Sequence, residues 1–319
     1  MAHYAEDMLK KTLLVVGATG RQGGAVIDAM LEKTEDYYPD MWEIIGMTRD
    51  PTQAASLALE KRGVSMVKGD CNDRESLRKL LDIHKPYAVF AVTNPFAARW
   101  TGGRPAATDT NAETAQGINL VDCSVAAGVS HFVFTSVASS HDSDPDGKGP
   151  VETFAAKAKV EDHLAKSGLS YTILGPVGFF ENMTSSFAGI KQGVVPGLIK
   201  EGVNAQMIAT KDIGWFARMV LCDPQPWLGK TLEIAGDNTN AWVQAATLKR
   251  IRGGGENWKV SVPPDFVFAL FIPKAVGRLC VLLSPQSTLQ SSLSHSHTHF
   301  LRTPMLLIGG IFWRKRGRG

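Results

Sequence analysis

The sequence has few cysteines, little net charge and no long apolar run, and each shortage argues against a class of protein. Its four cysteines lie far apart and form no Cys-x-x-Cys pair, which argues against a disulfide scaffold and favours a reducing compartment such as the cytoplasm. The formal net charge is only +3 over 319 residues, so neither nucleic acid nor an anionic membrane is expected as a partner.

No segment of the sequence is predicted to cross a membrane. The most apolar stretch is 266–283, and Pro273, Lys274 and Arg278 interrupt it well before a bilayer is spanned. The run Leu13–Val16 follows two lysines, as in a secretory signal, but it is short and leads into glycines rather than a cleavage site. With 44% apolar and 20% charged residues, the chain has the composition of a globular protein with a sizeable core.

Short β-rich segments alternate with helical patterns through the first 180 residues. This alternation is typical of right-handed βαβ units, and it predicts an α/β fold with a doubly wound parallel sheet of the Rossmann type. Several strand segments are apolar on both faces, as a sheet covered by helices on both sides requires. The predicted strands are residues 12–16, 43–47, 64–67, 87–92, 131–135, 171–174 and, late in the chain, 231–235.

Turn and cap residues mark the ends of the helices between these strands. Asn72 is predicted to begin a capping box, and Asn111 precedes the apolar-periodic segment 112–127. Gly128 and Gly168 each stand just before a strand, where a helix commonly ends in the left-handed conformation that glycine adopts readily.

A glycine-rich turn joins the first predicted strand to a helix predicted over 21–31, with the pattern Gly17-x-x-Gly20-x-x-Gly23. Gly17 permits a tight turn, Gly20 lets the main chain approach a pyrophosphate, and Gly23 allows helix and strand to pack closely. Because a helix N-terminus presents free N–H groups and a partial positive charge, the turn predicts a dinucleotide phosphate site. The alternative is a chance glycine turn.

The end of the second predicted strand indicates which dinucleotide binds. A carboxylate there would accept hydrogen bonds from the ribose hydroxyls of NAD and would repel the 2′-phosphate of NADP. Thr48 and Arg49 stand at this position instead, and the planar, always charged guanidinium suits a phosphate. The segment therefore predicts NADP(H), with a surface ion pair between Arg49 and Asp50 as the alternative.

The run Val-Val-Gly-Ala-Thr-Gly-Arg-Gln-Gly-Gly at 15–24 resembles the NmrA-like family of atypical short-chain dehydrogenase/reductases. Five further blocks resemble sequence blocks of the family and occur in the family's order: 48–51, 67–70, 92–94, 131–136 and 178–182. The resemblance covers about residues 11–280. The resemblance implies an NADP-binding protein of one of two kinds. Some members resemble reductases, and others resemble regulators that sense redox state and bind protein partners.

The resemblance also implies a set of cofactor contacts, which follow the carboxyl ends of predicted strands, where open α/β sheets bind ligands. The pyrophosphate is placed on Gly17, Ala18, Thr19, Gly20, Arg21 and Gln22, with Gly23 behind them, and the adenosine phosphate on Arg49, Asp50, Pro51, Thr52 and Gln53. Asp70 and Cys71 are implied near the adenine, Thr93, Asn94 and Pro95 along the ribose, and Phe179, Phe180, Glu181 and Asn182 near the nicotinamide. Both phenylalanines are equally consistent with ordinary core residues.

The residues for proton transfer depart from those of typical short-chain dehydrogenases, which use Tyr-x-x-x-Lys. Lys157 fits the lysine by its place in the helical segment 154–161, but Thr153 replaces the tyrosine, and a threonine hydroxyl is a far weaker acid than a phenol. If Lys157 belongs to the site, either it anchors the cofactor and donates a proton by itself, or no turnover occurs. The alternative interpretation of Lys157 is an ordinary solvated lysine on a helix surface. Ser136 is a second candidate hydroxyl beside the nicotinamide, or a turn residue.

These features predict an NADPH-dependent oxidoreductase that reduces a small organic molecule, such as an enone, a quinone or a carbonyl compound, in a biosynthetic pathway. The alternative is a non-enzymatic NADP(H)-binding regulator that binds a protein partner, and Thr153 in place of the tyrosine favours it.

Three regions are predicted along the chain: an NADP-binding domain over 1–180 to which the late strand returns, a smaller mixed substrate or partner lobe over 181–283, and a low-complexity tail over 284–319. Glycines and prolines after Leu174 break the chain into short pieces, which marks the transition to the lobe. The resemblance to the family ends near Cys280.

The composition of the tail favours disorder, because 284–298 is rich in serine and 313–319 is basic without apolar periodicity. The alternating His295, His297 and His299 are interpreted as low complexity, so no metal site is predicted. The basic residues of 314–318 are interpreted as solvated charge, with a nuclear signal as the alternative.

Overall fold

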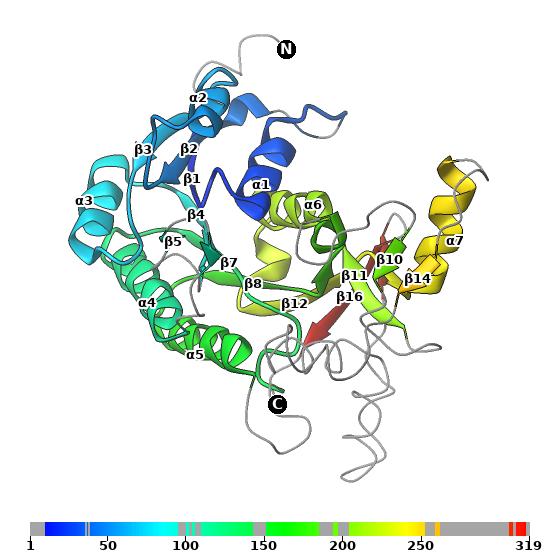
Figure 1. The fold of residues 1–319 in the computed structure, drawn as a ribbon. Coiled ribbons are helices and arrows are strands. Elements are labelled where there is room, and N and C mark those ends of the chain that lie inside the picture. The colour runs from blue at the N-terminus through cyan, green and yellow to red at the C-terminus, as the bar shows by residue number, and fades with distance from the viewer. Residues whose placement is uncertain are drawn as a thin grey trace. The chain divides into compact units, whose positions relative to one another are not determined.

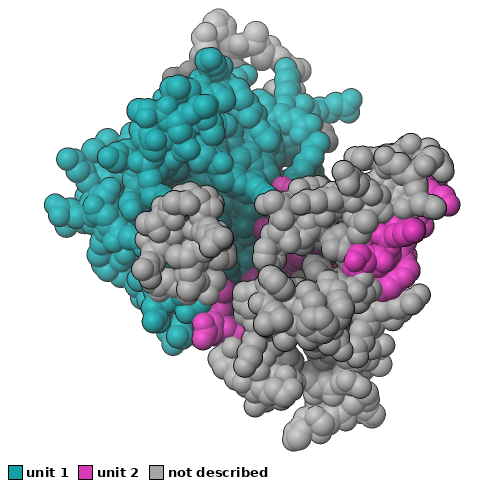
Figure 2. Space-filling view, in the orientation of Figure 1, with its two compact units in different colours: residues 1–136, 156–174, 211–231 teal, residues 137–155, 175–210, 232–319 magenta. Residues whose placement is uncertain are grey.

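The computed structural model describes residues 10–35, 37, 39–94, 100–101, 104–105, 110–142, 151–184, 194–196, 204–252, 259–261, 306–308 and 311–316. The chain divides into two compact units, which Figure 2 colours separately. Unit 1 comprises 1–136, 156–174 and 211–231, and unit 2 comprises 137–155, 175–210 and 232–319. The units interleave along the sequence. The three regions predicted from the sequence, 1–180 with the returning late strand, 181–283 and 284–319, stay predictions.

Unit 1 is built on a parallel sheet with the strand order β8-β7-β4-β1-β2-β3 (Figure 1). The strands are β1 (Lys11–Val16), β2 (Trp42–Thr48), β3 (Ser65–Lys68), β4 (Ala88–Val92), β7 (His131–Thr135) and β8 (Tyr171–Pro176). Neighbouring strands run parallel throughout this order, and the order reverses between β1 and β4. The predicted doubly wound fold is confirmed, and the predicted strands differ from the observed ones only at their terminal residues.

A further strand, β12 (Lys230–Ala235), follows β8 in the sheet order. It corresponds to the late strand predicted over 231–235. Its entry lies in unit 1, where the N–H of Gly229 donates to the carbonyl oxygen of Tyr171 at 2.7 Å. Gly229 has a φ of 68°, so glycine relieves the backbone strain of this tight entry.

Helices cover both faces of this sheet, and they are α1 (Arg21–Leu31), α2 (Ala54–Glu60), α3 (Arg74–His84), α4 (Thr110–Ala126), α5 (Glu152–Lys166) and α6 (Thr210–Cys222). The helices α3, α4 and α5 lie together on one side in Figure 1, and Leu81, Leu120 and Leu164 join one core with the strands. On the other side α6 packs closely on α1, because a Cβ at Gly214 would lie 2.6 Å from the carbonyl carbon of Ala25.

The start of α3 corrects one prediction. Asp73 rather than Asn72 caps this helix, and its carboxylate accepts a hydrogen bond from the N–H of Ser76 at 3.0 Å. Asn72 lies in the turn before the helix, where its backbone and side-chain N–H groups both donate to Asp70 Oδ1 at 2.9 Å. The cap of α3 thus lies one residue later than predicted.

The ends of the next helices agree more closely with the sequence. α4 begins at Thr110, so Asn111 lies inside the helix instead of before it. Gly128 and Gly168 have φ values of 70° and 83°, which confirms both as left-handed residues at the turns that lead into β7 and β8.

Unit 2 contains a small mixed sheet with the order β13-β11-β9. Its strands are β9 (Gly178–Phe179), β11 (Ala205–Ile208) and β13 (Asp237–Thr239), and β11 is parallel to β9 and antiparallel to β13. The parallel pair β10 (Val194–Pro196) and β14 (Lys259–Ser261) packs with α7 (Ala241–Arg252) around Val195. The remaining short elements are η1 (Pro39–Met41), η2 (Phe180–Thr184), η3 (Gln225–Trp227), β5 (Trp100–Thr101) and β6 (Arg104–Pro105).

Two further strands lie in the tail, where the composition favours disorder. β15 (Leu306–Ile308) and β16 (Ile311–Arg316) form an antiparallel pair, and β16 neighbours β12 in the sheet order. Isoleucine and aromatic residues within 306–313 explain this difference, because such residues favour extended structure. The serine-rich segment and His295, His297 and His299 lie outside the described residues.

Within the described part of the chain, every helix is too short or too polar to cross a membrane.

Candidate functional site

The glycine-rich turn between β1 and α1 brings the helix N-terminus close to the end of the strand. Gly17 has a left-handed φ of 67°, and a Cβ there would lie 2.8 Å from Val92 Cγ1 of β4. A Cβ at Gly23 would lie 2.8 Å from the carbonyl carbon of Gly17 and 3.1 Å from Ala18 Cα. The N–H of Gly20 closes the turn by donating to the oxygen of Gly17 at 2.8 Å. Larger residues would fill the turn or force the helix away from it.

The first turn of α1 suits an anion. Its N-cap is Gly20, and within the described residues no side chain caps this end and no acidic residue occupies the first turn. Backbone N–H groups and the positive end of the helix dipole therefore face the space before the helix, which is the arrangement that binds phosphate groups. The turn fits the pyrophosphate of a dinucleotide.

Gln22 connects the start of α1 with the end of β7. Its Oε1 accepts a hydrogen bond from Thr135 Oγ1 at 2.7 Å, and Thr135 is wholly buried. The Oε1 atom of Gln22 is thus engaged within unit 1, and the predicted contact of Gln22 with the pyrophosphate stays a prediction.

The turn after β2 gathers the residues predicted around the adenosine phosphate. Asp50 Oδ1 accepts hydrogen bonds from Thr52 Oγ1 at 2.7 Å and from the N–H of Thr52 at 2.9 Å, and these bonds lower the pKa of the Asp50 carboxyl. Gln53 Nε2 donates to Thr48 Oγ1 at 3.1 Å and lies 3.5 Å from Thr19 Oγ1 of the glycine-rich turn. The Asp50 carboxylate is therefore engaged by its own turn, while Gln53 bridges the two turns.

Cys71 lies close enough to Asp70 and to Arg49 to interact electrostatically with each. Burial raises the pKa of the Cys71 thiol to about 12, the Asp70 carboxylate adds to this rise, and the Arg49 guanidinium opposes it. A thiol that stays protonated is a poor nucleophile. Cys71 is thus suited to lining a binding site rather than to reacting.

Lys157 belongs to a buried network with Glu113 and Thr93. Its Nζ lies 3.0 Å from Glu113 Oε1 and donates to Thr93 Oγ1 at 3.1 Å, while Thr93 Oγ1 donates to the same carboxylate oxygen at 3.0 Å. The side chain of Glu113 is 0% exposed and that of Lys157 is 16% exposed. Lys157 is therefore not a solvated helix lysine, and the charged face of α5 lies elsewhere.

This network lies at the same edge of the unit 1 sheet as the glycine-rich turn. Thr93 follows directly after Val92, the residue that packs against Gly17. In the neighbouring strand β7, Thr135 is paired with Val92 and the Phe134 ring centroid lies 5.7 Å from Lys157 Nζ. Parallel strands present their carboxyl ends at one edge, so the lysine and the turn share the edge at which such sheets bind ligands.

Asn94 is held by Gln116 of α4. Its N–H donates to Gln116 Oε1 at 3.1 Å, and Gln116 Nε2 donates to the carbonyl oxygen of Asn94 at 3.3 Å and to Asn72 Oδ1 at 3.2 Å. Gln116 therefore fixes the segments after β3 and β4 relative to each other. Pro95, predicted along the ribose, lies outside the described residues.

The hydroxyl of Ser136 is engaged within the protein. Ser136 Oγ donates to Glu161 Oε1, and the two side chains are 4% and 2% exposed. Because this hydroxyl already binds a buried carboxylate, it is a weaker candidate than Lys157 for contact with a substrate.

The block predicted near the nicotinamide, Phe179 to Asn182, belongs to unit 2. Phe179 is paired with Ile208 in the mixed sheet. Glu181 Oε1 accepts hydrogen bonds from Thr210 Oγ1 at 2.7 Å and from the N–H of Thr210 at 2.8 Å. Glu181 thus binds the start of α6, and the role of this block at the nicotinamide stays a prediction.

The sequence analysis missed Glu113 and Glu161, although helical spacing offered a signal for the first. Glu113, Gln116 and Leu120 recur on one face of α4, and all three are buried. An acidic residue on an otherwise inward-facing stripe indicates a buried partner.

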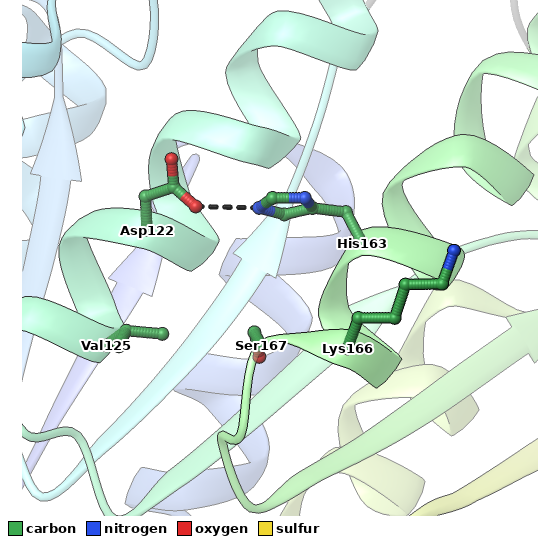
Figure 3. Close-up of a pocket in the computed structure, with 5 residues that line it drawn as sticks. All are labelled: Asp122, Val125, His163, Lys166 and Ser167. Atoms are coloured by element: carbon green, nitrogen blue, oxygen red, sulfur yellow. Dashed lines mark hydrogen bonds and ion pairs between the residues drawn. The ribbon is translucent and has the colours of Figure 1, made fainter.

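A surface pocket of about 300 Å³ lies elsewhere in unit 1 and is lined by Asp122, Val125, His163, Lys166 and Ser167 (Figure 3). His163 Nε2 lies 2.6 Å from Asp122 Oδ1, and Arg74 Nη1 lies 2.9 Å from Asp122 Oδ2. Burial raises the pKa of the Asp122 carboxyl, but the hydrogen bonds from His163 and Arg74 outweigh this and lower it. The pocket lies at the carboxyl ends of α4 and α5, whereas Lys157 and Glu113 lie nearer their amino ends.

In the regions that the structure describes, no three His, Cys, Asp or Glu side chains are grouped so as to hold a metal ion.

The fold and the turn define a protein of the Rossmann class. The model of the NmrA-like family matches residues 9–276, and the chain belongs to this family.

Several curated relatives are described as NmrA-like family domain-containing oxidoreductases. One from Aspergillus sp. (strain MF297-2) is 29% identical over 160 residues, which cover 50% of this chain and 43% of the relative. Another from Aspergillus flavus is 27% identical over 261 residues, which cover 76% of this chain and 73% of the relative. The chain thus spans less than half of the first relative's length.

Solved structures share the fold at low sequence identity. The NADP(H) complex of Citrobacter sp. triphenylmethane reductase has a TM-score of 0.63 at 17% identity, covering 85% of this chain and 87% of that one. The NADPH complex of an Escherichia coli NADPH-dependent quinone oxidoreductase has a TM-score of 0.62 at 22% identity, covering 84% and 86%. Nmra, described as a negative transcriptional regulator, has a TM-score of 0.64 at 16% identity, covering 86% and 81%.

Proposed function

We propose that the protein is an NADPH-dependent oxidoreductase that reduces a small organic molecule, such as an enone, a quinone or a carbonyl compound, with Lys157 as the proton donor. The observation that carries this proposal is the position of Lys157: a largely buried ammonium, held by Glu113 and Thr93, at the same sheet edge as the glycine-rich turn. A lysine that served only solubility would not be buried beside a carboxylate.

The cofactor would be held mainly by unit 1. The backbone of Gly17 to Gln22 would bind the pyrophosphate, and the small residues at Gly17 and Gly23 keep that cradle open. Arg49 would bind the 2′-phosphate, because it follows the end of β2 and its planar, always charged guanidinium suits a phosphate. Asp70 and Cys71 would line the adenine, and Lys157 would contact the nicotinamide ribose.

A nicotinamide bound there supplies a hydride to an electrophilic carbon of the substrate. Lys157 would give a proton to the substrate oxygen on which negative charge develops during this reduction. Lys157 is left as a neutral amine and is protonated again from solvent. General acid catalysis of this kind contributes roughly 10²- to 10⁴-fold to a rate, so one well-placed ammonium is enough to make up for the absent tyrosine.

The comparisons support this proposal at a coarse level. Curated relatives are oxidoreductases, and two of the structures with the same fold are reductases bound to NADP(H) or NADPH. The enone, quinone or carbonyl substrate is proposed from the chemistry of a hydride donor beside an ammonium.

The test is anaerobic NADPH oxidation with a panel of quinones, enones and aldehydes, measured for the native chain and Lys157→Arg. Arginine keeps the positive charge beside Glu113 but does not release a proton. We expect Lys157→Arg to bind NADPH within about threefold of native while its turnover falls roughly 100-fold or more. Lys159→Arg, an exposed change on the same helix, is the control and should behave as native. Unchanged turnover in Lys157→Arg would refute the role of Lys157.

Thr153 favours a second candidate function, a redox-sensing regulator, because it removes the usual phenol from the site. The shared fold with Nmra supports this candidate. A sensor must bind oxidised and reduced cofactor with different affinities, or favour different conformations with each. Equal affinities for NADP⁺ and NADPH, together with indistinguishable protease digestion patterns, would exclude sensing.

A further inference from the structure

We propose that Glu113 is the positioning residue of the site: together with Thr93 it fixes the position of Lys157 Nζ and directs one of its N–H bonds to a bound ligand. This inference rests on the proposed function, because it concerns the same lysine. Glu113 is not among the site residues predicted from the sequence.

The hydrogen bonds of the network fix the direction of each proton. An ammonium carries only donors, so Lys157 must donate to both Glu113 Oε1 and Thr93 Oγ1. The Thr93 hydroxyl accepts from Lys157 and gives its single hydrogen to Glu113 Oε1. Two of the three N–H bonds of Lys157 are thereby engaged, and among the described residues no acceptor is recorded for the third.

This arrangement also affects Thr93, whose predicted place along the ribose stays a prediction. Its hydroxyl hydrogen points to the carboxylate, so Thr93 does not have that hydrogen to give to a ribose. Thr93 and Glu113 therefore hold Nζ together, and Lys157 is the residue that contacts the ligand.

Glu113 is costly as a purely structural residue. Its side chain is 0% exposed, and Oε2 has no hydrogen-bond partner within the described part of the chain. A buried carboxylate with one unsatisfied oxygen is destabilising, and apolar residues of similar size often replace a buried ion pair without loss of stability. The residue is therefore better explained by what it does to Lys157 than by what it adds to the fold.

A second ion pair between the same helices provides a matched control. Asp122 of α4 contacts His163 of α5 at 2.6 Å, at the carboxyl ends of the two helices and with 28% and 37% of the side chains exposed. Asp122→Asn thus removes an acidic link between α4 and α5 without touching the network around Lys157.

The experiment measures acetylation of Lys157 by acetic anhydride at pH 8, read by peptide mass spectrometry, with Lys159 as the internal standard. Acetylation needs an amine that the reagent can approach, and the contacts with Glu113 and Thr93 restrain Nζ. In Glu113→Gln without cofactor, we expect Lys157 to react roughly tenfold faster or more, whereas Asp122→Asn should match the native chain. An unchanged rate in Glu113→Gln would overturn the proposal.

Cofactor protection separates this inference from the proposed function. NADPH should slow the acetylation of Lys157 and leave that of Lys159 unchanged. If NADPH gives no protection, Lys157 does not lie at the cofactor, but the inference about Glu113 still stands. If Glu113→Gln does not fold, Glu113→Asp retains the charge but withdraws it from Nζ, and it should raise the rate by a smaller factor. A native rate in folded Glu113→Asp would then overturn the proposal.

Discussion

Gly23 and Gly24 are adjacent in α1, and replacing each with alanine should have opposite effects on stability. A Cβ at Gly23 would lie 2.8 Å from the carbonyl carbon of Gly17 and 3.1 Å from Ala18 Cα, and both are backbone atoms. A Cβ at Gly24 meets its nearest heavy atom, the oxygen of Ala18, at 3.7 Å, which is an ordinary contact.

The expected magnitudes follow from these distances. Gly23→Ala can be accommodated only if α1 moves away from the turn, and overpacking of this kind costs about 1–3 kcal/mol of unfolding free energy. Gly24→Ala creates no clash and removes a glycine from a helix interior, which should add up to about 1 kcal/mol.

Urea unfolding followed by circular dichroism measures both changes, and a fluorescence titration with NADPH measures their effect on the turn. We expect Gly23→Ala to lower the urea midpoint and to weaken NADPH binding, while Gly24→Ala raises the midpoint and binds NADPH as the native chain does. A midpoint for Gly23→Ala equal to or above that of Gly24→Ala would refute the reasoning from close packing.

Three further results are expected. Arg49→Ala should weaken NADPH binding roughly 10-fold or more and leave NADH binding unchanged in calorimetry, because one charge-assisted phosphate contact is lost. Burial lowers the pKa of His131 to about 4, so the unfolded chain takes up a proton between pH 6.5 and 4 that the folded chain does not. The unfolding free energy should therefore fall by up to about 3 kcal/mol as the pH drops through this window, and urea titrations of His131→Gln should show a flatter dependence. Asp122→Asn should cost at most about 1 kcal/mol in urea unfolding, and the loss should shrink in 1 M salt, because its ion pairs are partly exposed.

The parts of the fold that depend on short-range pattern could be predicted from the sequence. The glycine-rich turn is local, because its geometry needs only the spacing of Gly17, Gly20 and Gly23 between a strand and a helix. The parallel strands could be predicted for the same reason, because each is a short β-rich segment. Several of these segments are apolar on both faces. Gly128 and Gly168 were predictable because only their own backbone conformation decides their role.

The residues that the sequence could not identify depend on contacts between distant segments. Glu113 and Lys157 are far apart in the chain, and only the packing of α4 beside α5 brings the carboxylate to the ammonium. The choice of Asp73 over Asn72 as the cap of α3 depends on the backbone path of the preceding turn, and both side chains can cap a helix. The sequence predicted that a late strand returns to the first domain, but the assignment of 137–155 to unit 2 depends on contacts between distant segments.

We propose that the glycine-rich turn, with Arg49 nearby, binds NADPH. A calorimetric titration of the full chain with NADPH and, separately, with NADH tests this proposal. We expect saturable binding of one NADPH per chain, roughly tenfold or more tighter than NADH, because one additional phosphate is recognised. Absence of saturable binding for both nucleotides would contradict the account, and equal binding of the two would contradict the role of Arg49.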